Sequence, residues 1–209
     1  MNPKMLTVDV KQFEKAISAY YRASRSLTDG EKHLLSTVYG SSVDYSRIRI
    51  RKGCIVEVFA AAITLNNLIC FSEEYYSDDF SKTGNFYSIP ILFHEVCHVW
   101  QYQNHIKYYW WFKALLEQLM YGSHVYDYVL DPAKCLVDYR FEQMGKILQD
   151  YIYAIIFQSP QLPVYEKIIY CSIKKGVSKH KNAWRKFMIK PKKHWQIQVT
   201  YNLGFGRGY

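Results

Sequence analysis

The chain has 209 residues, 49% of them hydrophobic, and carries a formal net charge of +9 at pH 7. This length and composition are those of a globular protein with a sizeable core, and they exclude a disordered chain. No apolar run reaches the roughly 18 residues of a membrane-spanning helix, and the N-terminus lacks the apolar segment of a signal peptide. We therefore expect synthesis in the cytoplasm, with no signal peptide and no transmembrane segment.

The first part of the chain predicts helices. Phe13, Ile17, Tyr20 and Tyr21 recur at helical spacing, which indicates an amphipathic helix within residues 8–24. After a break at residues 28–30, a second short helix is expected to end near Gly40.

Short strands are predicted next. SRIRIRKG, residues 46–53, alternates apolar Ile48 and Ile50 with arginines, which is the pattern of a half-buried strand. Residues 63–65 and 68–71 are two further β-rich runs around Asn66-Asn67, where asparagine tolerates turn geometry. We expect these runs to form a short antiparallel sheet.

SIPILFHEVCHVWQYQ, residues 88–103, predicts a helix from about residue 89 to 104, with Ser88 as N-cap and Pro90 in its first turn. It carries His94, Glu95 and His98 in the order H-E-x-x-H. Positions i and i+4 of a helix lie about 40° apart around the axis and about 6 Å apart along it, so the two imidazoles can bind one ion. Glu95, about 100° away from His94, can then take a proton from a water beside the ion.

Zinc is the expected ion, with one Zn²⁺ per chain. Neutral imidazoles suit zinc, and a catalytic site typically has three protein ligands and one position for water. A shuffled sequence of this composition would contain the motif only about 0.01 times per chain. The alternative is a pair of core histidines, but a buried glutamate between them would be costly without a cation.

The third ligand is not fixed by the motif. Gln101 and Asn104 stand where the metzincin signature needs Gly and His, so a carboxylate from further along is required. The candidates are Glu117, Asp127, Asp131, Asp138 and Glu142. Glu142 lies near the start of a second amphipathic pattern, residues 139–157, which could pack on the motif helix, but spacing alone leaves the choice open.

The five cysteines are Cys54, Cys70, Cys97, Cys135 and Cys171. Their odd number and wide spacing, with no C-x-x-C pair, argue against a disulfide framework or a zinc ribbon. We expect reduced thiols that are buried as small apolar residues.

The positive charge is concentrated at the C-terminal end. From Lys167 on there are eleven Lys and Arg residues and no Asp or Glu, interleaved with Trp184, Phe187 and Trp195. Such a segment can bind phosphate backbones, anionic membrane surfaces or an acidic protein, although charged runs are often only solvated. We divide the chain into residues 1–166, which form the domain, and a basic extension, residues 167–209, with an anionic partner as its candidate ligand.

A family resemblance rests on six segments in a fixed order. They are SLTDGE (26–31), VYGSSVDYSRIRI (38–50), TLNNLICF (64–71), YYSDDF (75–80), LFHEVCHVWQYQ (92–103) and FEQMGKILQDY (141–151). Over residues 25–155 the chain resembles small bacterial zinc-metallopeptidase-like domains attached to Rhs and VgrG proteins of type VI secretion and to phage-tail-like contractile injection systems. The family pattern has Gln and Ala where this chain has Met144 and Gly145.

The resemblance implies an α+β, zincin-like fold that is mostly helical, with a small antiparallel sheet beside the H-E-x-x-H helix. It also implies a gluzincin-like zinc site in which His94, His98 and Glu142 are the ligands and Glu95 is the general base. An edge strand within residues 64–71 would bind an extended peptide. The implied function is hydrolysis of a peptide or protein substrate after delivery out of the cell by a contractile secretion machine, which would itself be a partner.

Three functions from different classes stay open. We favour an active zinc endopeptidase, because Glu95 is needed for hydrolysis and for little else at this position. The second is a metal-stabilised module of a secretion system that catalyses nothing. The third is a nucleic-acid or anionic-surface binder that uses the basic extension and dissociates as salt rises. A group that stabilises the oxyanion would be a Tyr, His or Arg, but the 20 tyrosines leave it undetermined.

Overall fold

The computed structural model describes residues 18–53, 61–104 and 122–173. Residues 18–22 are helical, and residues 8–17 of the first predicted helix lie outside the described ranges. The elements that follow are β1 (Arg25–Ser26), α2 (Asp29–Tyr39), β2 (Arg49–Lys52), β3 (Ala62–Leu65), β4 (Leu68–Phe71), α3 (Ser88–Gln103), α5 (Phe141–Ile156) and α6 (Leu162–Tyr170), with 3₁₀ turns η1 (Tyr45–Arg47), η2 (Gly122–Tyr126) and η3 (Leu136–Asp138). The predicted α+β class is confirmed.

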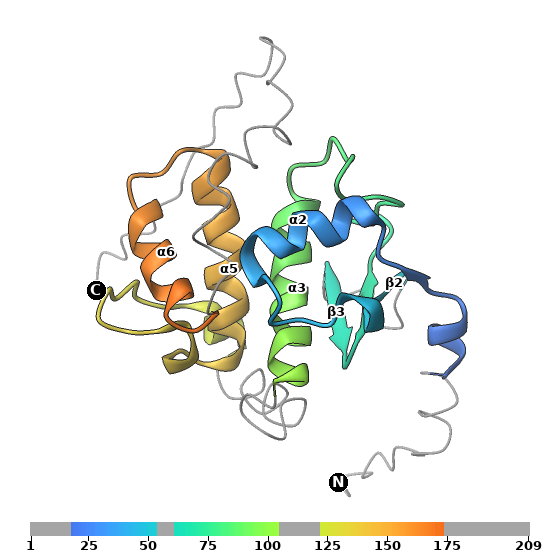
Figure 1. Ribbon diagram of the computed structural model, residues 1–209, viewed down its shortest axis with the longest axis horizontal. Helices are drawn as coiled ribbons and strands as arrows, with labels where there is room; N and C mark the ends of the chain where they lie inside the picture. The colour runs from blue at the N-terminus through green and yellow to red at the C-terminus, as the bar shows by residue number, and fades with distance from the viewer. Residues whose placement is uncertain (1–17, 54–60, 105–121, 174–209) are drawn as a thin grey trace, which may run out of the picture.

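Helix α3 is the centre of the fold. Figure 1 shows it between the sheet on one side and α5 and α6 on the other. From Leu92 to Gln101 every residue of α3 is buried, because the helix is covered on both flanks. A long helix buried in this way can present polar side chains to two neighbouring elements at once.

Helix α2 ends where the sequence predicts, but it begins at Asp29, within the predicted break at residues 28–30. The Thr28 hydroxyl accepts a hydrogen bond from the Glu31 N–H, and the Glu31 carboxylate accepts one from the Thr28 N–H, which forms a capping box. Gly40 ends the helix with a φ of 54°, a conformation that favours glycine. The fully buried Glu31 also pairs with Arg25 at 2.8 Å, so this helix start is tied to β1.

The sheet corrects one expectation. Its strand order is β1-β2-β4-β3; β1 is antiparallel to β2 and β3 to β4, but β2 and β4 are parallel. The turn at Asn66, with a φ of 59°, fixes only the β3–β4 hairpin. Local patterns do not set the pairing of β2 with β4, which uses a long crossover that contains β3 itself. The fully antiparallel sheet that we predicted is therefore wrong.

Two predicted boundaries also shift. Strand β2 starts only at Arg49, because residues 45–47 form η1, in which the Ser46 N–H donates to the Asp44 carboxylate. Ser88 is not the N-cap of α3 but its first residue. The chain turns into the helix earlier, because the Asn85 side chain accepts a hydrogen bond from the Tyr87 N–H and the Asn85 carbonyl accepts one from the Ser88 N–H.

Helix α5 confirms the second amphipathic pattern and packs along α3. On the other side of α5 lies α6, which crosses the predicted boundary at residue 166 and places Ile168 and Ile169 in the core. Residues 174–209 lie outside the described ranges, so the anionic partner of the basic extension stays a prediction. In the part of the chain that is described, we find no helix whose length and apolar character would let it cross a membrane.

Two of the cysteines contradict the expectation of reduced thiols. Cys135 and Cys171 form a disulfide, with Cα atoms 5.6 Å apart. They are 36 residues apart in sequence and meet because η3 lies beside the end of α6, which no spacing rule reveals. Cys70 and Cys97 are buried, as predicted, and Cys54 lies outside the described ranges.

Candidate metal centre

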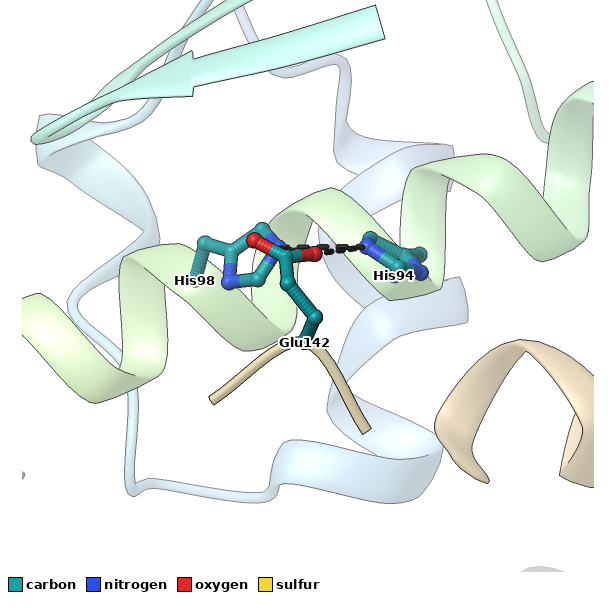
Figure 2. Close-up of side chains that lie close together, drawn as sticks. All are labelled: His94, His98 and Glu142. Atoms are coloured by element: carbon teal, nitrogen blue, oxygen red, sulfur yellow. Dashed lines mark hydrogen bonds and ion pairs between the residues drawn. The ribbon is translucent and has the colours of Figure 1, made fainter. Parts of the chain in front are cut away.

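Three side chains from two helices converge between α3 and α5. His94 and His98 project from α3, and Glu142 reaches toward both rings from the first turn of α5, as Figure 2 shows. The Glu142 Oε2 atom lies 3.4 Å from His94 Nε2 and 3.3 Å from His98 Nε2, and the two Nε2 atoms are 3.1 Å apart. The helical spacing and the helix packing together produce this cluster.

The geometry of this cluster fits a metal ion. Ligand atoms about 2.1 Å from a tetrahedral zinc ion lie about 3.4 Å from one another, close to the three separations observed. Two imidazoles and one carboxylate are a donor set found in catalytic zinc sites, in which water takes the fourth position. Among the described residues, these are the three whose ligand atoms come together in this way.

The other carboxylate candidates lie elsewhere. Asp127 is exposed and pairs with His124, Asp131 caps the N–H of Ala133, and Asp138 caps the N–H of Cys135. Glu117 lies outside the described ranges. The structure therefore brings Glu142 to the two histidines, whereas its role as a ligand stays a prediction.

The cluster favours a charged carboxylate. Burial alone would raise the pKa of Glu142, but the neighbouring imidazoles of His98 and His94 hold it well below its ordinary value. Burial also acts on His98, where it lowers the pKa. The negative charge of the Glu142 carboxylate has the larger effect and raises the pKa of His98 to about 9. Each group thus stabilises the charge that its partner carries, and a metal ligand carboxylate has to be ionised in the same way.

Gln101 orients one of the rings. Its side-chain N–H donates to the Phe141 carbonyl at 3.0 Å, so its Oε1 atom faces His98 Nδ1 at 2.8 Å and must accept from it. In the neutral ring that a metal requires, a proton on Nδ1 leaves Nε2 of His98 with the lone pair that binds the ion. The His98 ring also stacks on Phe141, with centroids 4.7 Å apart, so the start of α5 holds this ligand from two sides.

Gly145 allows the other ring to lie against α5. A Cβ atom at this position would be 2.8 Å from the His94 ring, closer than real side-chain contacts allow. The departure from the family pattern at Gly145 therefore coincides with a close approach of the His94 imidazole to the α5 backbone. The glycine helps to bring Glu142, one turn earlier, into reach of both histidines.

Glu95 points toward the sheet, about 100° around α3 from His94 and about 60° from His98. It is only 6% exposed, and its Oε2 atom accepts a hydrogen bond of 2.7 Å from the hydroxyl of Thr64 on β3. The histidines thus face α5, whereas the neighbouring Glu95 carboxylate on the same helix is held by a strand.

A tyrosine borders the cluster. The ring of Tyr126, in η2, lies 6.0 Å from that of His94, and the residue is 36% exposed. Partial burial, together with the charges of Glu142 and Glu95, raises the pKa of Tyr126 to about 12, so its hydroxyl keeps its proton at neutral pH. This side chain is a hydrogen-bond donor at the edge of the site.

The sequence did not indicate three of these residues. In the sequence Gln101 stands out only as a departure from the metzincin signature, although its position three residues after His98 places it on the same helix face. No local signal singles out Thr64 or Tyr126, since both reach the site through tertiary packing.

The comparisons with known proteins point to type VI secretion. No protein-family model matches the chain. It is 33% identical over 138 residues to the type VI secretion system spike protein VgrG2b of Pseudomonas aeruginosa; the match covers 62% of this chain but 13% of that protein. The solved effector domain of Pseudomonas aeruginosa VgrG2b superposes with a TM-score of 0.58 at 27% identity, over 78% of this chain and 97% of that one. This similarity links the chain to VgrG-associated proteins of type VI secretion.

Proposed function

We propose that the chain is a zinc-dependent metallopeptidase with a zincin-like fold and a gluzincin-like site. The observation that carries this proposal is the convergence of His94, His98 and Glu142 on one point, with the Glu95 carboxylate next to them on the same helix. In a zinc enzyme these residues have distinct tasks: three bind the ion and the fourth moves protons.

The residues around the site support hydrolysis of an amide. A bound zinc ion would act as a Lewis acid and lower the pKa of water. Glu95 takes a proton from the attacking water and passes it to the leaving amine nitrogen. The Tyr126 hydroxyl, protonated and partly exposed, is the candidate donor to the oxygen of the substrate carbonyl, where negative charge develops.

The sheet supports an extended peptide as substrate. Both edges of β4 are paired with neighbouring strands, so β4 cannot bind a peptide. Within the predicted edge segment, residues 64–71, β3 is therefore the strand that can bind one. Within the described ranges no strand pairs with the outer edge of β3, which lies beside α3. A peptide can add there as a further strand through main-chain hydrogen bonds.

Delivery by a type VI secretion system is the second part of the proposal. The relatives are a spike protein and its effector domain, and this chain matches nearly the whole of that domain. We infer that the chain acts as an effector whose partner is the spike of such a machine.

The test begins with metal analysis of the protein purified without added metal. We expect about one zinc per chain in the wild type and in Glu95→Gln, and a large loss in His98→Ala and Glu142→Ala. Each is then incubated with a proteome-derived peptide mixture, and new termini are counted by mass spectrometry. Cleavage by the wild type that disappears in Glu95→Gln supports the peptidase.

Two outcomes would contradict the proposal. A folded wild-type protein that neither contains zinc nor takes it up on addition cannot be a zinc peptidase. A protein that binds zinc but cleaves nothing, and in which Glu95→Gln is indistinguishable from the wild type, would instead be the metal-stabilised module.

A further inference from the structure

Thr64 occupies an unusual position on β3. It is 5% exposed and faces α3, whereas the other three residues of this short strand are only partly buried. A buried strand position that packs on a helix ordinarily holds an apolar side chain, and a buried hydroxyl there requires a hydrogen-bond partner. The partner of Thr64 is the side chain of Glu95.

The contact is short and directed at the carboxylate. Thr64 Oγ1 lies 2.7 Å from Glu95 Oε2 and 3.1 Å from the main-chain oxygen of Glu95. A hydroxyl has one proton, and an ionised carboxylate is the stronger acceptor of the two. The main-chain oxygen lies in the middle of α3 and accepts within the helix, so the carboxylate is the acceptor that explains the threonine.

We propose that Thr64 is a positioning residue for the general base, an inference that rests on the proposed peptidase function. By binding Oε2, the hydroxyl fixes the rotamer of Glu95 and leaves Oε1 to face the attacking water. When the water O–H bond breaks, Glu95 gains the proton on Oε1, and Oε2, now the carbonyl oxygen of the acid, still accepts from the Thr64 hydroxyl. Thr64 therefore holds Glu95 before and after the proton moves on to the amine.

The location of Thr64 adds a consequence for substrate binding. The strand that carries it is also the strand whose outer edge is proposed to bind the peptide. The hydrogen bond from Thr64 thus connects the peptide register to the position of Glu95. General bases act only within hydrogen-bond reach of the proton they take, so a displaced carboxylate lowers kcat while the affinity for peptide is retained.

The test compares Thr64→Val, which keeps the shape but removes the hydroxyl, with Thr64→Ser, which keeps the hydroxyl. Zinc content is measured first, and then kcat and KM on a synthetic copy of the peptide that the wild type cleaves fastest. We expect Thr64→Val to keep its zinc and its KM within about threefold, and to lose kcat by about 10- to 100-fold. Thr64→Ser should restore kcat to within a few-fold of the wild type.

Thr37→Val is the matched control. Thr37 is also buried, and its hydroxyl donates to the Leu34 carbonyl in α2 at 2.6 Å, so its loss changes stability without touching the site. If Thr64 were merely structural, both valine variants would lower the melting temperature and leave kcat unchanged, and the inference would be overturned. Zinc loss in Thr64→Val would overturn it as well.

The failure of the inference differs from the failure of the proposed function. If Glu95→Gln abolishes cleavage and Thr64→Val leaves kcat at the wild-type value, the peptidase stands and the role of Thr64 is wrong. If the wild type shows no cleavage that depends on Glu95, the proposed peptidase function is wrong, and the proposed role of Thr64 is then wrong as well.

Discussion

The two flanks of α3 carry different parts of the proposed chemistry. On the flank toward α5, the ligand atoms of His94, His98 and Glu142 lie within 4.8 Å of one another. On the flank toward the sheet, Glu95 is bound by a strand. Metal binding therefore depends on how two helices pack, whereas proton transfer depends on a hydrogen bond between a helix and a strand.

The largest effect on zinc should come from Glu142→Gln, which keeps the size of the side chain but removes its charge. One of three ligands is lost, so we expect zinc affinity to fall on the order of 100-fold or more. Competition with a chelator of known affinity measures it. Glu95→Gln, on the other flank, should bind zinc like the wild type, and equal losses in both variants would show that the flanks are not separate.

A smaller loss is expected from Gln101→Leu. The leucine has a similar volume but cannot accept from His98 or donate to the Phe141 carbonyl, so the ring loses its fixed tautomer and orientation. Removing such an outer partner of a metal ligand typically costs about 10- to 100-fold in affinity. The same chelator competition applies, and an unchanged affinity would mean that stacking on Phe141 alone orients the ring.

Gly145→Ala tests the packing of the two helices. An alanine inside a helix ordinarily stabilises it by up to about 1 kcal/mol relative to glycine. Here its methyl group would meet the His94 ring, so we expect overpacking to cost about 1–3 kcal/mol in the free energy of unfolding and zinc affinity to fall about 10-fold. Denaturant unfolding gives the first value.

The control for Gly145→Ala is Gly84→Ala, because a Cβ atom at Gly84 would meet nothing within 4 Å. It should leave both stability and zinc affinity close to the wild-type values. A Gly145→Ala protein that is more stable than the wild type and binds zinc as well would show that the His94 ring moves aside freely.

The flank toward α5 also shows what could be predicted from sequence. The shared face of His94 and His98 follows from helical spacing alone, and the end of α2 follows from Gly40, but the start of α2 was predicted too late. Glu142 could be assigned only through the family resemblance, because five carboxylates fitted the spacing equally well.

Elsewhere the information is tertiary. The β3–β4 hairpin is local and was predicted, but the parallel pairing of β2 with β4 joins segments that are separated by that hairpin. In the sequence Thr64 looks like an ordinary strand residue, because β-branched side chains favour strands whether or not they bind a carboxylate. Its role is visible only once β3 lies beside α3.

The smallest effect on zinc should come from the Cys135–Cys171 disulfide. It closes a loop between residues 36 apart, so its loss in Cys135→Ser should lower the free energy of unfolding by about 2–4 kcal/mol. Because this loop contains the start of α5, zinc affinity should fall only a few-fold, through a less firmly held Glu142.

Thermal unfolding with and without reductant measures the contribution of the disulfide to stability. Reductant should lower the wild-type melting temperature to that of Cys135→Ser and leave the melting temperature of the variant unchanged. A wild type that does not respond to reductant while Cys135→Ser is destabilised would assign the loss to packing around η3 instead, and the flank toward α5 would then be held by its side chains alone.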